Sequence, residues 1–353
     1  MGVSDLVNSN TVELPENVEL LLVTRPENVR YLSGFTAPED ALVVFSPTGA
    51  TLFTDARYEE QAPAESRIPV EIVNPREGYG FLAPYLRGKT VGYEGAHLPC
   101  ARLRKVEAAC GCELTPTEGV IEAARAVKGP EEAEKIAAAA RLADQGLAHI
   151  LPLIQPGTAE RELALELEFW LRKNGAEKAA FDFIVASGAR GALPHGVASE
   201  KKIAAGELVT IDFGAVVAGY HSDMTRTVAV GEVAPEMRRV FEVVLEALEA
   251  ALTALRPGMV ARELDAVARR VIEKAGYGPR FVHSLGHGVG LEIHEAPFLN
   301  PRSEEVLKPG MVVTLEPGIY LPGKGGVRIE ELGVVTESGI SLLSHAPRGW
   351  LEV

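Results

Sequence analysis

The stretch Pro156-Gly157-Thr158-Ala159-Glu160-Arg161-Glu162-Leu163 recurs about a hundred residues later as Pro257-Gly258-Met259-Val260-Ala261-Arg262-Glu263-Leu264. Each copy opens an amphipathic helix that is predicted to stop at a glycine, Gly175 in the first copy and Gly276 in the second. About forty residues further on, a strand at residues 209–214 recurs at residues 313–318. Each copy is therefore predicted to run helix, helix, strand hairpin, and a repeat of this length points to two halves of one domain.

Each copy also carries two acidic residues in its strands. Asp212 and Glu316 occupy the same place in the first strand of their copies, and Asp223 and Glu330 follow them. In the first copy a tight turn at residues 218–219 predicts antiparallel strands with Asp212 and Asp223 roughly opposite each other. If the copies pack about a pseudo-twofold axis, all four carboxylates converge at one point.

Four converging carboxylates would repel one another and lose their hydration, which costs several kcal/mol for each uncompensated buried charge. Two divalent cations would cancel the four charges, and His287, set among glycines at residues 286–290, can supply one imidazole. Paired cations of this kind form a hydrolytic centre. Four oxygen-donor residues and one nitrogen favour Mn²⁺ or Co²⁺, with Zn²⁺ as a further option.

Three more histidines, His195, His283 and His294, lie near these motifs. A single histidine of this kind is more often structural, but the clustering favours a role in donating to a tetrahedral intermediate or moving a proton. Arg328 shares a strand face with Glu330 by the two-residue period of a strand, so it is expected to orient that carboxylate. A structural ion pair is the alternative for Arg328.

The chain of 353 residues is long enough for two domains, with the boundary expected near residue 125. The first part reads as a small α/β domain because short apolar strands alternate with helical patterns. A helix is then expected at residues 116–128, and a long alanine-rich helix at residues 131–151. The strands expected before them are residues 20–23, 41–45, 51–54, 70–73 and 91–93.

The composition argues against several kinds of partner. A net charge of −14 would repel nucleic acids and anionic lipid surfaces, so neither is expected as a partner. The first twenty residues are polar and no later segment is a long apolar run, which predicts a cytoplasmic protein. Three cysteines, Cys100, Cys110 and Cys112, form no disulfide framework.

Taken together, these motifs resemble the proline-specific metallopeptidases of the pita-bread fold, which are the Xaa-Pro dipeptidases (prolidases) and Xaa-Pro aminopeptidases. The resemblance covers nearly the whole chain, because residues 25–35 are similar to the creatinase-like N-terminal domain of that family. It implies an α/β (α+β) protein with an N-terminal domain at residues 1–125, serving substrate access and dimerisation, and a pita-bread catalytic domain at residues 126–353. The motifs that carry the resemblance are residues 187–196, 210–214, 222–227, 286–288, 316–320 and 327–331.

The resemblance also implies a role for each site residue. Asp212 would bind one metal ion, Asp223 and Glu330 would bridge two, and His287 with Glu316 would complete the second. Glu316 would also accept a proton from the attacking water. His195 and His294 would contact the substrate and the intermediate, and His283 would lie close by. Arg302 would point toward the carboxylate of the substrate.

The sequence leaves the choice within this family open. An Xaa-Pro dipeptidase is favoured because the chain is short and Arg302 could hold a free proline carboxylate, whereas an Xaa-Pro aminopeptidase would act on longer peptides. A methionine aminopeptidase-like enzyme would leave the first 125 residues unused, and a non-catalytic pita-bread protein would be expected to lack metal ligands. The resemblance further implies a homodimer.

Overall fold

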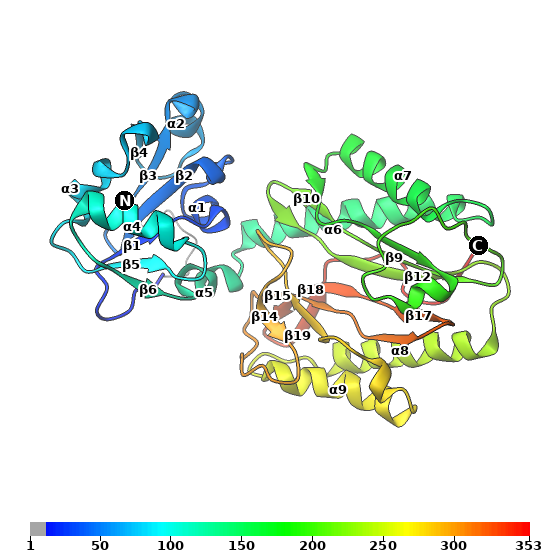
Figure 1. The fold of residues 1–353 in the computed structure, drawn as a ribbon. Coiled ribbons are helices and arrows are strands. Elements are labelled where there is room, and N and C mark those ends of the chain that lie inside the picture. The colour runs from blue at the N-terminus through cyan, green and yellow to red at the C-terminus, as the bar shows by residue number, and fades with distance from the viewer. Residues whose placement is uncertain (1–11) are drawn as a thin grey trace. The chain divides into compact units, whose positions relative to one another are not determined.

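The computed structural model describes residues 12–353, and the chain divides into two compact units, one up to Arg125 and one from Ala126 onwards (Figure 1). The expected α/β architecture is confirmed in both units. No helix in the part of the chain that the structure describes is long and apolar enough to cross a membrane.

The N-terminal unit is built around a six-stranded sheet with the strand order β4-β3-β2-β1-β5-β6. Its apolar centre includes Leu22, Phe53 and Leu82, which are almost completely buried. Helices α1 (Pro26–Ser33), α2 (Gln61–Glu65), α3 (Ala83–Leu86), α4 (Cys100–Cys110) and α5 (Val120–Ala126) accompany the sheet. Its strands are β1 (Leu20–Val23), β2 (Ala41–Ser46), β3 (Gly49–Asp55), β4 (Val70–Val73), β5 (Val91–Glu94) and β6 (Leu114–Thr117).

One expected element of this unit is wrong. The helix predicted at residues 116–128 begins only at Val120, because Pro116 lies in strand β6, which pairs parallel with β5. Proline is compatible with this position because β6 is the edge strand of the sheet, where a missing N–H breaks no ladder on the open side.

The second unit consists of two helix pairs that enclose strands, with α6 and α7 on one side and α8 and α9 on the other (Figure 1). The helices are α6 (Pro130–Ile150), α7 (Glu160–Lys173), α8 (Pro235–Ala254) and α9 (Ala261–Lys274). One sheet has the order β20-β12-β9-β8, with β8 (Ile184–Ser187), β9 (Leu208–Phe213), β12 (Met224–Ala229) and β20 (Leu351–Glu352). Another has the order β14-β13-β15-β18-β19, with β13 (Gly286–Gly288), β14 (Glu295–Leu299), β15 (Val312–Leu315), β18 (Glu331–Thr336) and β19 (Gly339–Leu342).

Smaller sheets complete this unit beside the two main ones. Strand β10 (Ala215–Val217) lies between β7 (Lys178–Ala179) and β11 (Tyr220–His221). Strands β16 (Gly318–Leu321) and β17 (Gly325–Arg328) form a two-stranded hairpin.

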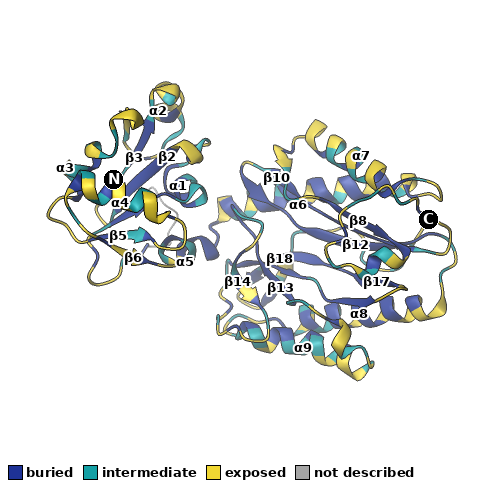
Figure 2. Ribbon diagram, viewed as in Figure 1, coloured by how far each residue is buried: buried dark blue, intermediate teal, exposed yellow. Residues whose placement is uncertain are grey.

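The repeated helices bury the same face in both halves (Figure 2). Helix α7 buries Leu163, Leu167 and Leu171, and α9 buries Leu264, Ala268 and Ile272 at the equivalent positions, four residues apart. Fully burying a side chain such as leucine stabilises the fold by about 1.5–3 kcal/mol, so the three buried residues of each helix hold it against the rest of the unit. As predicted, both helices end just before a glycine of positive φ, Gly175 and Gly276.

Candidate metal centre

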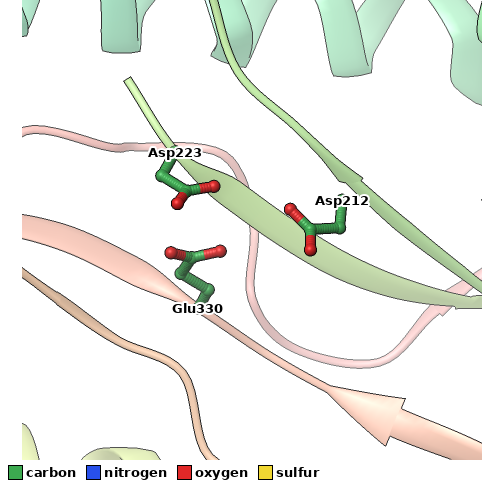
Figure 3. A group of neighbouring side chains, drawn as sticks. All are labelled: Asp212, Asp223 and Glu330. Atoms are coloured by element: carbon green, nitrogen blue, oxygen red, sulfur yellow. The ribbon is translucent and has the colours of Figure 1, made fainter. Parts of the chain in front are cut away.

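Three carboxylates from the two halves meet inside the second unit (Figure 3). Asp212 lies in β9, Asp223 lies one residue before β12, and Glu330 lies between β17 and β18. Ligand oxygens of these three residues all lie within 4.8 Å of one another. The repeat therefore does bring acids that are more than a hundred residues apart in the sequence to one point.

The strand register differs in detail from the expected one. Asp212 stands opposite Thr225 rather than Asp223, because the register set by the turn at residues 218–219 continues unchanged past Gly214 and Ser222. A Cβ atom on Gly214 would lie 1.9 Å from the carbonyl oxygen of Ser222, so only glycine allows this close approach. This register places Asp223 diagonally across from Asp212, and ligand oxygens of the two residues still lie within 4.8 Å of each other.

His287 and Glu316 join the carboxylates from the second half of the unit. The Nε2 atom of His287 lies 3.3 Å from Oε1 of Glu316 and 3.5 Å from Oδ2 of Asp223. Its Nδ1 atom lies 3.0 Å from the carbonyl oxygen of Gly288, which can only accept, so Nδ1 carries a hydrogen and donates it. This backbone bond directs Nε2 toward the acids, as expected for a metal-ligating imidazole.

The electrostatics of the cluster favour a bound cation. Burial is the main cause that raises the pKa of Asp223 to about 7 and that of Glu330 well above its ordinary value; the neighbouring acids contribute to both rises, and His287 opposes them. Glu316 is also buried, but a hydrogen bond from His287 lowers its pKa to about 2. Among residues 12–353, Oδ1 of Asp212, Oδ1 of Asp223 and Oε1 of Glu330 are buried side-chain oxygens without a hydrogen-bond partner. Buried acceptors in this state are satisfied by metal ions, so the donor set fits divalent cations.

Arg328 lies beside the acids, but its direct carboxylate partner is Asp212 and not Glu330. Its Nε atom donates to Thr225 Oγ1 at 3.1 Å, and the Thr225 hydroxyl donates to Oε2 of Glu330 at 2.9 Å. The expected orientation of Glu330 by Arg328 is therefore corrected: the arginine reaches Glu330 only through Thr225. Strand β17 packs against β9, which carries Asp212, and this packing decides which acid is nearer to Arg328.

Tyr320 belongs to the same network, although the sequence reasoning assigned it no role. Its hydroxyl accepts a hydrogen bond from Nη1 of Arg328 at 2.7 Å and lies 2.8 Å from Nε2 of His283. The facing glycines make room for the ring, because a Cβ on Gly318 or Gly326 would come within 3.0 Å of Tyr320 atoms. In the sequence, the only indication of this role was the pair of glycines close to Tyr320 in a short hairpin, which leave space for a large neighbouring side chain.

The cluster opens into a cavity of about 440 Å³ that is lined by all five candidate ligands and by all three candidate histidines. His195 and His294 are exposed at this cavity, and the His294 ring lies 4.3 Å from that of His287, edge to face. His283 is more enclosed, and burial lowers its pKa. The apolar residues of the lining are Phe181, Ile184, Pro194, Val197 and Phe298.

Arg302 does not belong to this group. It is exposed on the loop between β14 and β15, is not among the residues that line the cavity, and its backbone N–H donates to Asn300 Oδ1 at 2.9 Å. Among residues 12–353, no side-chain hydrogen bond or ion pair directs its guanidinium toward the cavity, where the substrate carboxylate was expected.

The fold and this carboxylate-rich centre define a metal-dependent hydrolase, and comparison with known proteins identifies the family. Residues 134–337 match the model of metallopeptidase family M24, and residues 15–127 match that of the creatinase/prolidase N-terminal domain. The chain therefore belongs to metallopeptidase family M24.

Individual relatives extend over almost the whole chain. An Xaa-Pro dipeptidase from Pyrococcus furiosus is 42% identical, with 94% of this chain and 95% of the relative covered. The structure of an Xaa-Pro dipeptidase from Bacillus anthracis matches at 40% identity with a TM-score of 0.92, covering 99% of this chain and 98% of that one. An X-Pro aminopeptidase from Thermotoga maritima matches at 38% identity with a TM-score of 0.89, covering 95% and 98%.

Proposed function

We propose that this chain is an Xaa-Pro dipeptidase, which hydrolyses the bond between an amino-terminal residue and proline. The observation that carries the proposal is the lining of one cavity by five potential ligands, three of which have buried oxygens without a partner among the described residues. Relatives of about 40% identity are named Xaa-Pro dipeptidases, and their similarity extends over both units.

The residues that would hold two divalent cations are Asp212, Asp223, His287, Glu316 and Glu330. When bound, the cations would lower the pKa of a water molecule and polarise the carbonyl of the scissile bond. Mn²⁺ or Co²⁺ is proposed ahead of Zn²⁺, because most of the donors are carboxylate oxygens.

The other residues of the cavity would act on the substrate and on protons. We assign Glu316 as the acceptor for the proton of the attacking water, because its carboxylate lines the cavity beside His287. His195 and His294, exposed at the cavity, would donate to the oxygen that becomes negatively charged in the tetrahedral intermediate. Arg328 would hold Asp212 in place, and Tyr320 would donate its hydroxyl hydrogen to Nε2 of His283.

The substrate class agrees with such a site. The bond to proline has no amide hydrogen, so an enzyme that relies on that donor binds it poorly. A centre that acts on the carbonyl alone has no need of it. The apolar side of the cavity, with Phe181, Ile184 and Phe298, offers a surface for the apolar part of a short peptide.

An Xaa-Pro aminopeptidase is the second candidate, because the Thermotoga maritima structure with that name is nearly as similar as the dipeptidases. A methionine aminopeptidase-like enzyme ranks lower, since a creatinase/prolidase N-terminal domain occupies residues 15–127. A non-catalytic role ranks lower as well, because all five potential ligands are retained.

Turnover of matched peptides tests the proposal. The protein loaded with Mn²⁺ is expected to cleave Leu-Pro rapidly, Leu-Pro-Gly slowly, and Met-Ala-Gly not at all. Faster cleavage of the tripeptide would make the chain an aminopeptidase. Cleavage of Met-Ala-Gly alone, or no cleavage by protein that contains two metal ions per chain, would refute the proposed function.

We also propose a homodimer in the cytoplasm, with the N-terminal domain of residues 1–125 serving substrate access and dimerisation. The family resemblance supports the dimer. Sedimentation analysis of the full chain, and of a chain without its first domain, tests the dimer. Cell fractionation tests the location.

A further inference from the structure

An ion pair on α9, between the buried Asp265 and the partly exposed Arg269, lies outside the metal cavity and contacts the segment that carries His283. Nε of Arg269 lies 2.8 Å from Oδ2 of Asp265, and Nη2 lies 2.9 Å from Oδ1, so the pair is bidentate. Asp265 is only 1% exposed. Neither residue lines the cavity, so the pair has no direct contact with a substrate there.

The pair holds alternate residues of the backbone between the 3₁₀ turn Gly278–Arg280 and strand β13. Nη1 of Arg269 donates to the carbonyl of Phe281, and Nη2 donates to the carbonyl of His283, each at 3.0 Å. Oδ1 of Asp265 accepts from the N–H of Leu285 at 3.1 Å. The guanidinium also lies 4.2 Å from the centre of the Phe281 ring. His283 is therefore held on both sides, in a stretch that has no regular secondary structure of its own.

The position of this backbone decides what the His283 ring can do. Nδ1 lies 2.8 Å from the carbonyl oxygen of Ser284, so it carries the hydrogen and leaves Nε2 as an acceptor. Nε2 then faces the hydroxyl of Tyr320, which accepts from Arg328, the partner of Asp212. A shift of the His283 backbone would break the hydrogen bond between His283 and Tyr320, and with it the connection to Arg328 and Asp212.

We propose that Asp265 and Arg269 are positioning residues that set the place and the tautomer of His283, and thereby govern turnover without holding metal. The inference rests on the proposed peptidase function for its kinetic consequence only. Misplacing a catalytic group by about 1 Å can lower the rate about a hundredfold. The ion pair therefore acts on the rate of the chemical step rather than on substrate affinity.

The test uses the full-length, metal-loaded protein with Arg269→Met, Arg269→Lys and Asp265→Asn. Arg269→Met is expected to lower kcat about 10- to 100-fold with KM within about threefold and metal content unchanged. Arg269→Lys keeps the charge but has fewer directed donors, and should restore part of kcat. The control is Lys324→Met, which removes an exposed ion pair with Glu236 in the same unit and should leave kcat unchanged.

Two further measurements separate positioning from simple stabilisation. In a His283→Ala background, Arg269→Met should have no additional effect on kcat, because the pair acts through that histidine. Nitrogen NMR of ¹⁵N-histidine-labelled protein should show the His283 tautomer disturbed by Arg269→Met and not by Lys324→Met.

Three outcomes overturn the inference: a lower melting temperature with kcat and spectrum intact, loss of metal in proportion to activity, or full additivity with His283→Ala. The NMR result does not require catalysis. If the wild-type protein cleaves no proline peptide, the proposed function fails while the positioning of His283 is still tested.

Discussion

Asp223 lies where its protonated form is favoured as long as no cation neutralises its surroundings. Its pKa of about 7 compares with about 3.9 for an aspartate in an unfolded chain. Between these values the folded state binds more protons, so the free energy of unfolding of metal-free protein should fall as pH rises from about 4 to about 7. Below the lower value both states are protonated, and above the upper value both are ionised, so this group adds no slope there.

The fall for this one group should approach about 4 kcal/mol over the whole range, because a shift of one pKa unit is worth about 1.36 kcal/mol. Melting curves in EDTA from pH 4.5 to pH 7.5 measure it. Asp223→Asn cannot ionise, so its metal-free form should lose less stability over the same range. If the melting temperatures of the two proteins changed with pH in the same way, the pKa of Asp223 would not be raised in the folded protein.

The hydroxyl of Tyr320 joins His283 to Arg328, so Tyr320→Phe should lower kcat about tenfold or more while the ring continues to pack. Metal content should stay unchanged, since the hydroxyl contacts none of the proposed ligands. Steady-state kinetics with metal analysis checks this. Tyr277→Phe, at a tyrosine that is not part of the hydrogen-bond network of His283 and Arg328, is the matched control. Equal kcat for the two variants would refute a role for the hydroxyl.

At the scale of elements, the turn between β13 and β14, which carries His294, depends on a buried lysine. Nζ of Lys128 lies 2.7 Å from Oε1 of Glu295, and both side chains are almost fully buried. Gly290 makes room for this carboxylate, because a Cβ there would lie 2.3 Å from Oε1. The residue next to His294 is thus fixed by a charge pair.

Lys128→Met leaves Glu295 buried without its cation, and such a change destabilises a protein by about 3–5 kcal/mol. The double variant Lys128→Met/Glu295→Gln removes both charges and should recover most of the loss in melting temperature. Lys324→Met, at an exposed pair, should cost about 0–1 kcal/mol. A double variant no more stable than the single one would exclude the charge as the cause.

The elements that the sequence predicted well are those with long, local signals. Helices α7 and α9 follow from a burial period that repeats four residues apart, and the glycines after them mark their ends. Strand β6 was missed because Pro116 resembles a helix start and its strand pairing is non-local. The partner of Arg328 and the role of Tyr320 depend on packing between strands that are far apart in the sequence, such as β17 and β9. Residue spacing along the chain does not determine that packing.

At the scale of the whole molecule, the proposed ligands all belong to the second unit, from Ala126 onwards. Bound cations should therefore stabilise only that unit, since a ligand raises the stability of whatever folded state it binds. Calorimetry of the full chain should show two transitions, of which EDTA lowers one by several degrees and leaves the other in place. A uniform shift of both would mean that the units unfold together.

The duplicated build of the second unit also restricts when the protein can acquire its metal. Asp212 and Asp223 are synthesised well before the other three proposed ligands, so a nascent chain that ends before His287 contains only two of the five. Metal capture is thereby confined to chains whose synthesis has passed the second copy. In the cell, a centre that contains its metal ions would therefore be found only in chains whose two copies have both been synthesised and have packed together.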